Sequence, residues 1–165
     1  YKLKVLASYD INKDFEYKVN IGKLKMLEDL SGYPGVKPPW GTLTALNLNT
    51  GKIIWQVPFG YYEKLKLKNE ADTGTENFGG ATATAGGLVF ASGTLDKLIR
   101  AFDAENGKEL WSYKLPYIGS APPTSYEANG EQYIIVPASG GISLKFLYPK
   151  LVEQGDAFVA FKIQD

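Results

Sequence analysis

Short apolar segments follow one another along residues 42–163, separated by turns rich in Gly and Asn. Runs of this length, bounded by such turns, predict β-strands. The clearest group predicts four consecutive strands, at 81–85, 88–92, 98–102 and 109–115. Two strands are predicted before this group and three after it, at 42–48, 53–57, 123–127, 132–137 and 157–163. The pattern therefore predicts an all-β chain whose strands come in sequential groups.

One motif occurs twice within these strands, from Ala45 to Trp55 and from Ala101 to Trp111, and a truncated third copy starts at Ala160. Each full copy has the end of a strand, a turn that tolerates positive φ, and a Trp four residues after the turn Gly. Such repeats predict a β-propeller, in which one Trp per copy docks a blade on its neighbour. We therefore expect both Trp side chains to be mostly buried, and truncation of Trp111 to Ala to cost about 3–5 kcal/mol.

The length of the chain indicates part of a propeller. Propellers contain four to eight four-stranded blades, and 165 residues leave room for about three. Unpaired sheet edges then predict association with missing N-terminal blades or with a second copy of the chain. Residues 1–40 differ from the rest and are expected to form an N-terminal segment with a partial blade and a Pro/Gly loop. Residues 41–165 are expected to form the C-terminal blades.

Three further segments give weaker signals. Residues 24–30 are compatible with a short helical turn, whereas the Pro and Gly residues of 31–41 exclude regular structure. Residues 59–82 form a long connection, which in a compact domain is usually functional. Within it, the alternation over residues 63–68 predicts the solvated face of a strand.

Charge and composition exclude several classes of function. The 18 basic residues balance the 18 acidic residues, so nothing favours a nucleic-acid partner. The chain has no His and no Cys, so by itself it cannot complete a Ser-His-Asp triad, a thiolate site or a His-ligated metal site. No apolar run is long enough to span a bilayer, and no acidic cluster predicts a calcium site.

Several motifs, in a fixed order along the chain, resemble those of a known family. They are PPWGTLTA at 38–45, TGTENFGG at 73–80, AGGLVF at 85–90, DKLIRAFD at 96–103, YEANGEQY at 126–133 and GDAFVAF at 155–161. Together they resemble the C-terminal part of the pyrroloquinoline-quinone (PQQ)-dependent dehydrogenases, specifically the membrane-type quinoprotein glucose dehydrogenases. The resemblance runs from about Gly32 to Ile163, most of the chain.

This resemblance implies an eight-bladed propeller with PQQ and a calcium ion in a polar funnel on its axis. It implies oxidation of a sugar or alcohol hydroxyl by proton abstraction with hydride transfer to the quinone, and then electron transfer to a quinone pool or a cytochrome. It also implies a periplasmic protein, or one associated with the periplasmic side of the membrane. The family's general-base Asp and its quinone-contacting Lys belong to blades upstream of Gly32. No catalytic residue and no metal ligand is therefore expected in this segment, which by itself is expected to be inactive.

The resemblance assigns cofactor-binding roles to five residues: Asn77, Gly79, Gly80, Asp96 and Trp40. Asn77 and the two glycines are expected to let the backbone approach a planar cofactor, or they simply form a Gly-rich loop that enters a strand. Asp96 accepts a hydrogen bond from a substrate hydroxyl or holds a cationic neighbour, or it is only a turn residue. Trp40 lies at the funnel wall, or it anchors its own loop.

One departure from the family pattern leaves the substrate open. In the glucose-oxidising members a His near the substrate follows the Gly-Gly of the last blade, whereas Ile142 follows Gly140-Gly141 here. An alternative function also remains, a non-enzymatic propeller scaffold or interaction module that binds no quinone, as in outer-membrane assembly factors. The motifs at 38–41 and 73–77 favour the enzyme, because a scaffold needs only the repeat.

Overall fold

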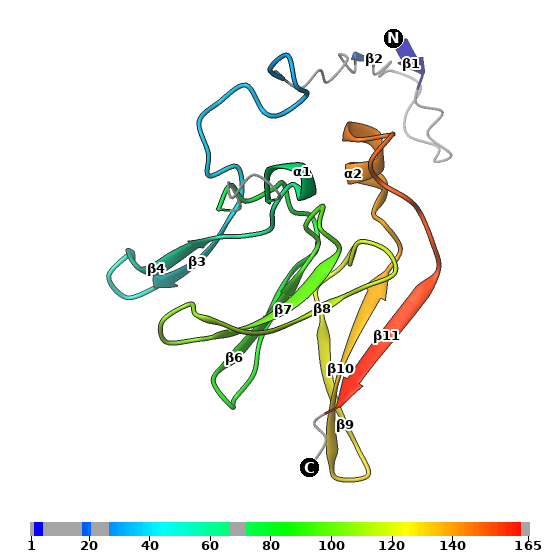
Figure 1. Cartoon of the computed structure of the whole chain (residues 1–165). Coiled ribbons are helices and arrows are strands. Elements are labelled where there is room, and N and C mark those ends of the chain that lie inside the picture. Colours follow the sequence, from blue (N-terminus) through cyan, green and yellow to red (C-terminus); the bar gives the residue numbers. More distant parts are fainter. Residues whose placement is uncertain (1, 5–17, 21–26, 67–71, 163–165) are drawn as a thin grey trace, which may run out of the picture.

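The strands of the computed structural model, which describes residues 2–4, 18–20, 27–66 and 72–162, all pair in antiparallel sheets (Figure 1). Two sheets have two strands each, β1 (Lys2–Lys4) with β2 (Lys18–Asn20) and β3 (Thr42–Asn47) with β4 (Lys52–Pro58). The next is four-stranded, with β5 (Gly80–Ala83), β6 (Leu88–Ser92), β7 (Leu98–Asp103) and β8 (Glu109–Lys114) in sequence order. The last contains β9 (Thr124–Ala128), β10 (Glu131–Ala138) and β11 (Ala157–Lys162). The all-β class and the sequential grouping of the strands are thus confirmed.

The four-stranded sheet has the strand order of one propeller blade. Its strand β7 lies between β6 and β8, and Ile99 to Phe102 are all buried. The outer strand β8 is exposed along its whole length. A strand covered on both sides needs apolar residues on both faces, which explains why Leu98, Ile99, Ala101 and Phe102 of β7 are apolar. The one charged residue within that buried run, Arg100, therefore needs a partner inside the protein.

Consecutive sheets pack face to face on apolar side chains. Ile99 of β7 packs with Leu115 against Val136 of β10. On the other face, Phe102 packs with Phe59, which follows β4. Each interface joins one sheet to the next along the chain, as successive blades of a propeller do.

The two ends of the sheets differ in character. The hairpin turns of residues 48–51, 104–108 and 129–130 lie at one end (Figure 1). The other end carries the two helices, α1 (Glu63–Lys66) and α2 (Ile142–Leu147), and the turn that joins β6 to β7 (Figure 1). We call this second end the loop end. None of the helices in the described part of the chain is long and apolar enough to cross a membrane.

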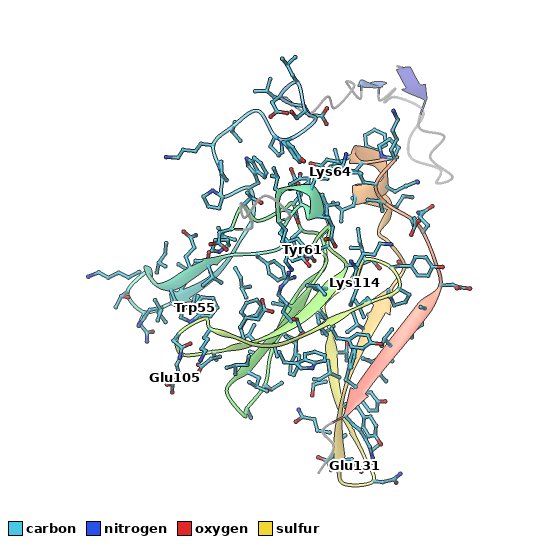
Figure 2. All side chains as sticks on the ribbon, in the orientation of Figure 1. Trp55, Tyr61, Lys64, Glu105, Lys114 and Glu131 are labelled. Carbon is cyan, nitrogen blue, oxygen red and sulfur yellow. The ribbon has the colours of Figure 1, made fainter. Side chains whose placement is uncertain are left out.

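Trp55 contacts the turn that follows β7 in the next sheet. Its indole N–H donates a hydrogen bond to the carbonyl oxygen of Ala104 at 2.9 Å (Figure 2). A Cβ added to Gly107 would lie 2.6 Å from the indole ring, so the ring rests on this glycine. Trp55 is partly buried in this position, and Gly107 is the turn residue that its packing requires.

Trp111 is more exposed than the repeat predicts, with 39% of its surface accessible. Its ring meets Phe161 of β11 edge to face at 5.2 Å and stacks on Tyr113. In the next sheet, the segment equivalent to the turn that covers Trp55 comes after Lys162 and lies outside the described residues. The prediction that Trp111 is mostly buried is therefore wrong for this structure.

This exposure lowers the expected cost of truncating Trp111. Trp111→Ala removes edge-to-face and stacked contacts but leaves no closed cavity, so we expect a loss of about 1–2 kcal/mol. Thermal unfolding of the variant measures the loss. Trp55→Ala, which also removes a hydrogen bond to the next sheet, serves as the comparison and should cost more. Equal losses for the two variants would contradict this assignment.

Three local predictions differ from the structure. Residues 63–66 form α1 and not a strand, with Leu65 buried and Lys64 and Lys66 exposed. Residues 27–30 form no helical turn, and residues 24–26 lie outside the described part. The helix α2 was not predicted. Leu65 is one buried residue between two exposed ones, a pattern that a strand and a single helical turn satisfy equally well.

Candidate functional site

A cavity of about 620 Å³ opens at the loop end, beside the first strands of the last two sheets. In a propeller, the first strand of each blade lies nearest the axis. We call it the central cavity. The residues that line it are Phe78, Ser120, Ser139, Gly141, Ile142, Ser143, Gln154 and Gly155.

The loop before β5 is held in place by Asn77. The Asn77 side chain donates to the carbonyl oxygen of Ser92 at 2.6 Å, and its own oxygen accepts from the backbone N–H groups of Gly79 and Gly80 at 3.2 and 3.3 Å. A Cβ on Gly79 would overlap the Ser92 carbonyl, so only glycine allows this approach. The loop therefore lies flat on the end of β6, and Phe78, half exposed, lines the cavity.

The lining of the central cavity also includes a hydroxyl pair. Ser120 and Ser139 stand 2.5 Å apart, Oγ to Oγ, and the backbone N–H of Gly155 donates to the Ser139 carbonyl oxygen. Gly140 and Gly141 both have positive φ, 84° and 66°. These glycines turn the chain from β10 into α2, which places Ser139 at the cavity. Phe78 and these hydroxyls give the central cavity one aromatic face and one hydrogen-bonding face.

A second cavity, of about 660 Å³, lies near the outer strands at the same end, and we call it the outer cavity. Tyr61 and Lys64 near α1 and Lys114 of β8 lie around it (Figure 2). Lys114 pairs with Glu63 at 2.8 Å, and this hydrogen bond raises the pKa of the Lys114 ammonium group. The outer cavity is therefore charged, whereas the central cavity is neutral.

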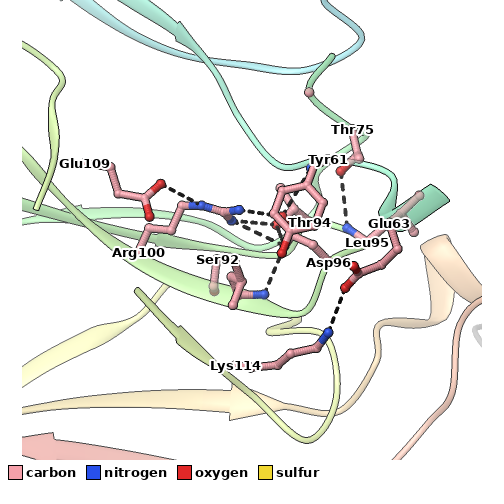
Figure 3. Close-up of polar contacts among 12 residues, drawn as sticks. Tyr61, Glu63, Thr75, Ser92, Thr94, Leu95, Asp96, Arg100, Glu109 and Lys114 are labelled. Carbon is pink, nitrogen blue, oxygen red and sulfur yellow. Dashed lines mark hydrogen bonds and ion pairs between the residues drawn. The ribbon is translucent and has the colours of Figure 1, made fainter. Parts of the chain in front are cut away.

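Asp96 is buried at the edge of the outer cavity, with 1% of its surface exposed. Its carboxylate forms an ion pair with Arg100 at 2.5 Å and accepts hydrogen bonds from Thr94 Oγ1 at 2.6 Å and from the backbone N–H groups of Leu98 and Tyr61 (Figure 3). Both carboxylate oxygens thus have partners within the protein. Of the roles expected for Asp96, this geometry favours that of holding a cationic neighbour.

Trp40 packs against Tyr33 and Tyr62, two tyrosines that line the outer cavity. Its indole N–H donates to the Val36 carbonyl oxygen at 2.7 Å, and its ring stacks on Tyr33 and meets Tyr62 edge to face at 5.4 Å. These contacts favour the role of a loop anchor. A contact between Trp40 and a cofactor stays a prediction, as do the same roles for Asn77, Gly79, Gly80 and Asp96.

The five predicted site residues thus fall into two groups. Asn77, Gly79 and Gly80 shape the central cavity, whereas Asp96 and Trp40 lie beside the outer one. Sequence reasoning missed the hydroxyl of Ser120, because a single Ser residue in a loop carries no motif. In the described part of the chain, no group of three or more acidic, His or Cys side chains could hold a metal ion.

Two buried tyrosines meet one carboxylate beside α1 and α2. Tyr62 donates to Glu76 at 3.0 Å, and the hydroxyl of Tyr148 lies 3.5 Å from that of Tyr62. Burial is the main cause that raises the pKa of Tyr62 above its usual value of 10.0, and the hydrogen bonds to Tyr148 and Glu76 add to it. Burial, then hydrogen bonding to Glu76, likewise raises the pKa of Tyr148.

These raised pKa values predict a loss of stability in alkali. Below the unfolded pKa of 10.0 both states keep the phenol protons; above it the unfolded chain ionises first, so the free energy of unfolding falls as the pH rises. We expect Tyr62→Phe to lessen this fall between about pH 9 and about pH 11. Urea unfolding at the two pH values measures it. An exposed tyrosine variant, Tyr126→Phe, is the control, and an equal effect of both variants would refute the prediction.

Comparison with known proteins identifies the family of this fold. Residues 5–134, more than half of the chain, match the family model described as the β-propeller domain of glucose/ethanol/alcohol dehydrogenases of the PQQ type. The chain is 37% identical to a quinate/shikimate dehydrogenase (quinone) from Acinetobacter baylyi over 92% of its own length and 18% of that protein. It is 32% identical to a quinoprotein glucose dehydrogenase from Escherichia coli, over 81% of the chain and 17% of the relative.

Solved structures agree on the fold. The quinohemoprotein alcohol dehydrogenase from Comamonas testosteroni superposes with a TM-score of 0.55 and 23% identity over 81% of this chain and 18% of that one. The chain thus spans about a fifth of the length of these relatives. Its sequential antiparallel sheets, the match to the family model and the likeness to its relatives agree, and this chain belongs to the PQQ-dependent dehydrogenases as part of their β-propeller domain.

Proposed function

We propose that this chain is part of a PQQ-dependent dehydrogenase that oxidises a hydroxyl of a sugar or alcohol, with hydride transfer to the quinone. The observation that carries the proposal is the central cavity, which combines one aromatic face and paired hydroxyls beside the first strands of two sheets. Membership of the family supports PQQ as the cofactor. A scaffold would need neither the glycines that shape this cavity nor its hydroxyls.

The cavity residues fit one face of PQQ. This cofactor is a planar aromatic quinone with carboxylates, and when bound it supplies a hydride acceptor. The exposed Phe78 offers a flat apolar face, and the hydroxyls of Ser120 and Ser139 offer hydrogen-bond donors. The described lining has no cation, so we assign the partners of the PQQ carboxylates to residues outside it.

In this proposal the residues of this chain position the cofactor and the substrate and take no part in bond making or breaking. Asn77 fixes the loop that presents Phe78, and the Phe78 ring excludes water from the face it covers. The Ser120–Ser139 pair orients a bound oxygen atom by hydrogen bonding. In this proposal the general base and the calcium ligands lie elsewhere in the longer protein, and the electrons then pass to a quinone pool or a cytochrome. A periplasmic location, with or without membrane association, is part of the same proposal.

Unpaired edge strands indicate that this segment pairs with strands of another segment or chain. Strand β3 pairs only with β4, and β11 pairs only with β10, among the strands in the described part of the chain. An open edge offers unpaired N–H and C=O groups to another strand. We propose that further blades of the same protein, or a second copy of this chain, complete these sheets.

PQQ binding to the full-length protein that carries this chain tests the proposed function. We expect the protein, with calcium present, to bind PQQ and to reduce an artificial acceptor when a sugar or alcohol is added. Phe78→Ala should raise the Kd for PQQ about three- to tenfold, because an aromatic contact is lost. Phe158→Ala removes another exposed Phe ring, on β11 and outside the cavity lining, and is the control. A protein that binds no PQQ would favour the scaffold.

A further inference from the structure

Two Asn-Gly pairs occur in the sequence, and both lie in hairpin turns. Asn106-Gly107 belongs to the turn between β7 and β8, and Asn129-Gly130 to the turn between β9 and β10. Asn followed by Gly is prone to spontaneous deamidation, because Gly has no side chain that would shield its backbone nitrogen from the Asn amide. This nitrogen reacts only when it can reach the side-chain carbonyl carbon, so the folded structure decides which pair reacts.

The structure restrains every reacting group of Asn106-Gly107. The Asn106 side-chain nitrogen donates to Asp103 Oδ2 at 3.0 Å, and the side-chain oxygen accepts from the backbone N–H of Lys108 at 2.9 Å. The N–H of Gly107 donates to the Asp103 carbonyl oxygen, also at 2.9 Å. Trp55 covers this glycine, since a Cβ added to Gly107 would lie 2.6 Å from the indole ring. Deamidation at Asn106 would have to break these contacts first.

Asn129-Gly130 is much less restrained. Both residues are exposed, and a Cβ added to Gly130 would meet no atom within 4 Å. The next residue, Glu131, lies at the tip of the hairpin (Figure 2). In the described part of the chain, neither the Asn129 side chain nor the N–H of Gly130 forms a hydrogen bond. The two groups that react are therefore accessible to each other and to water.

We infer that Asn129 is a site of spontaneous deamidation, whereas the fold protects Asn106. The deprotonated backbone nitrogen of Gly130 attacks the side-chain carbonyl carbon of Asn129, the bond from that carbon to the amide nitrogen breaks, and ammonia leaves. Water then opens the five-membered succinimide at either carbonyl and gives aspartate or isoaspartate. Asparagine and water thus become an acid and ammonia, with no change in oxidation state. This inference does not depend on the proposed function.

The reaction changes the hairpin in which it occurs. Strands β9 and β10 are joined by these two residues alone, at φ of 55° and 77°, and the length of such a turn fixes the register of the strands. Isoaspartate adds one carbon to the backbone of this turn. Either product adds a carboxylate close in sequence to Glu127 and Glu131. Strand β10 leads to Ser139 of the central cavity, so the altered turn belongs to a strand that reaches this cavity.

Ageing of the full-length protein that carries this chain tests the inference. The folded protein is incubated in mildly alkaline buffer and digested in mild acid. Mass spectrometry quantifies both Asn-Gly peptides, and enzymatic methylation identifies isoaspartate. We expect the initial rate at Asn129 to exceed that at Asn106 at least about tenfold, because breaking the hydrogen bonds of Asn106-Gly107 adds to the barrier there. Equal rates in the folded protein, or no reaction at Asn129, would overturn the inference.

The unfolded chain is the matched control. In concentrated urea the contacts of Asn106-Gly107 are lost, so we expect the rates at the two sites to agree within about twofold. A tenfold difference that persisted in urea would show that the flanking residues, and not the fold, cause it, and would also overturn the inference.

Trp55→Ala tests the protection of Asn106 in the folded protein. The variant uncovers Gly107, so we expect the rate at Asn106 to rise severalfold and the rate at Asn129 to stay the same. Asn129 in the same protein serves as the internal reference, because a general loosening of the fold would raise both rates. An unchanged rate at Asn106 would contradict the protection that the structure assigns to this ring.

Discussion

Asp96→Ala is expected to lower the free energy of unfolding by about 3–5 kcal/mol, because it leaves the guanidinium of Arg100 buried without its main partner. Asp96 and Arg100 are 1% and 4% exposed. The variant also leaves the backbone N–H groups of Leu98 and Tyr61 and the hydroxyl of Thr94 without this acceptor (Figure 3). Urea or thermal unfolding of the protein measures the loss.

Two further variants separate the charge effect from general damage. Glu109 is the second partner of Arg100, at 3.1 Å, but its side chain is 44% exposed. Glu109→Ala should therefore cost only about 0.5–1 kcal/mol. Combining Asp96→Ala with Arg100→Met removes the unpaired cation, and the double variant should be more stable than Asp96→Ala alone. A double variant that is less stable than the single one would show that the buried charge is not the cause.

The role of Asp96 could not be predicted from the sequence alone. The motif DKLIRAFD placed an Asp in a turn before a strand, and both a site role and a turn role fitted that position. The missing observation was that Arg100 lies in a strand covered on both sides, where a cation needs a buried partner. The spacing of the two residues could have suggested the pair, because a residue in a tight turn lies close to the strand that follows it. Their pairing depends on the packing of the neighbouring sheets, which the sequence alone does not state.

The strands were predictable because each is bounded by turn residues. Gly and Asn at the hairpins fixed the ends of β6 at Leu88 and Ser92, and those of most other strands to within about two residues. The long connections were not predictable in the same way. Helix α2 follows two glycines and carries exposed apolar residues, Ile142 and Phe146, so its pattern gave no amphipathic signal. Short helices in loops depend on tertiary contacts more than on their own sequence.

In the candidate site, too, some features were predictable from the sequence and others were not. The sequence predicted that the Gly-rich loop at 77–80 lets the backbone approach a planar cofactor, or that it simply enters a strand. In the structure Gly79 lies against the end of β6 and Gly80 begins β5, and a contact with a cofactor stays a prediction. The hydroxyls of Ser120 and Ser139 come from separate loops of the last sheet and meet only in the folded protein. Their contribution to the central cavity therefore required the three-dimensional structure.

Gly140→Ala is expected to be the most damaging single-methyl change at the central cavity. Gly140 has φ of 84°, which an L-residue adopts only with strain of about 1–2 kcal/mol. A Cβ at this position would also overlap the carbonyl oxygen of Glu153, a backbone atom that cannot turn aside. Strain and overlap together predict a loss of about 2–4 kcal/mol in the free energy of unfolding.

The same change has a functional consequence. Gly140 lies between Ser139 and Gly141, and its backbone N–H donates to the Ile118 carbonyl oxygen at 2.9 Å. A shift of this segment away from Glu153 would move Ser139 relative to Ser120 and to Gln154 on the same cavity wall. We therefore expect Gly140→Ala to raise both the KM for the sugar or alcohol substrate and the Kd for PQQ in the full-length protein, because hydrogen-bonding groups are displaced.

Gly130→Ala provides the matched control for both measurements. Gly130 has a similar φ of 77°, but a Cβ there meets no atom within 4 Å in its exposed hairpin turn. It should therefore cost only the backbone strain, about 1–2 kcal/mol, and leave substrate and PQQ affinity unchanged. Unfolding of the two variants side by side isolates the overlap with Glu153 as the difference between them. Equal losses of stability would mean that the chain around Gly140 relaxes freely, and unchanged affinities would mean that this segment does not shape the binding site.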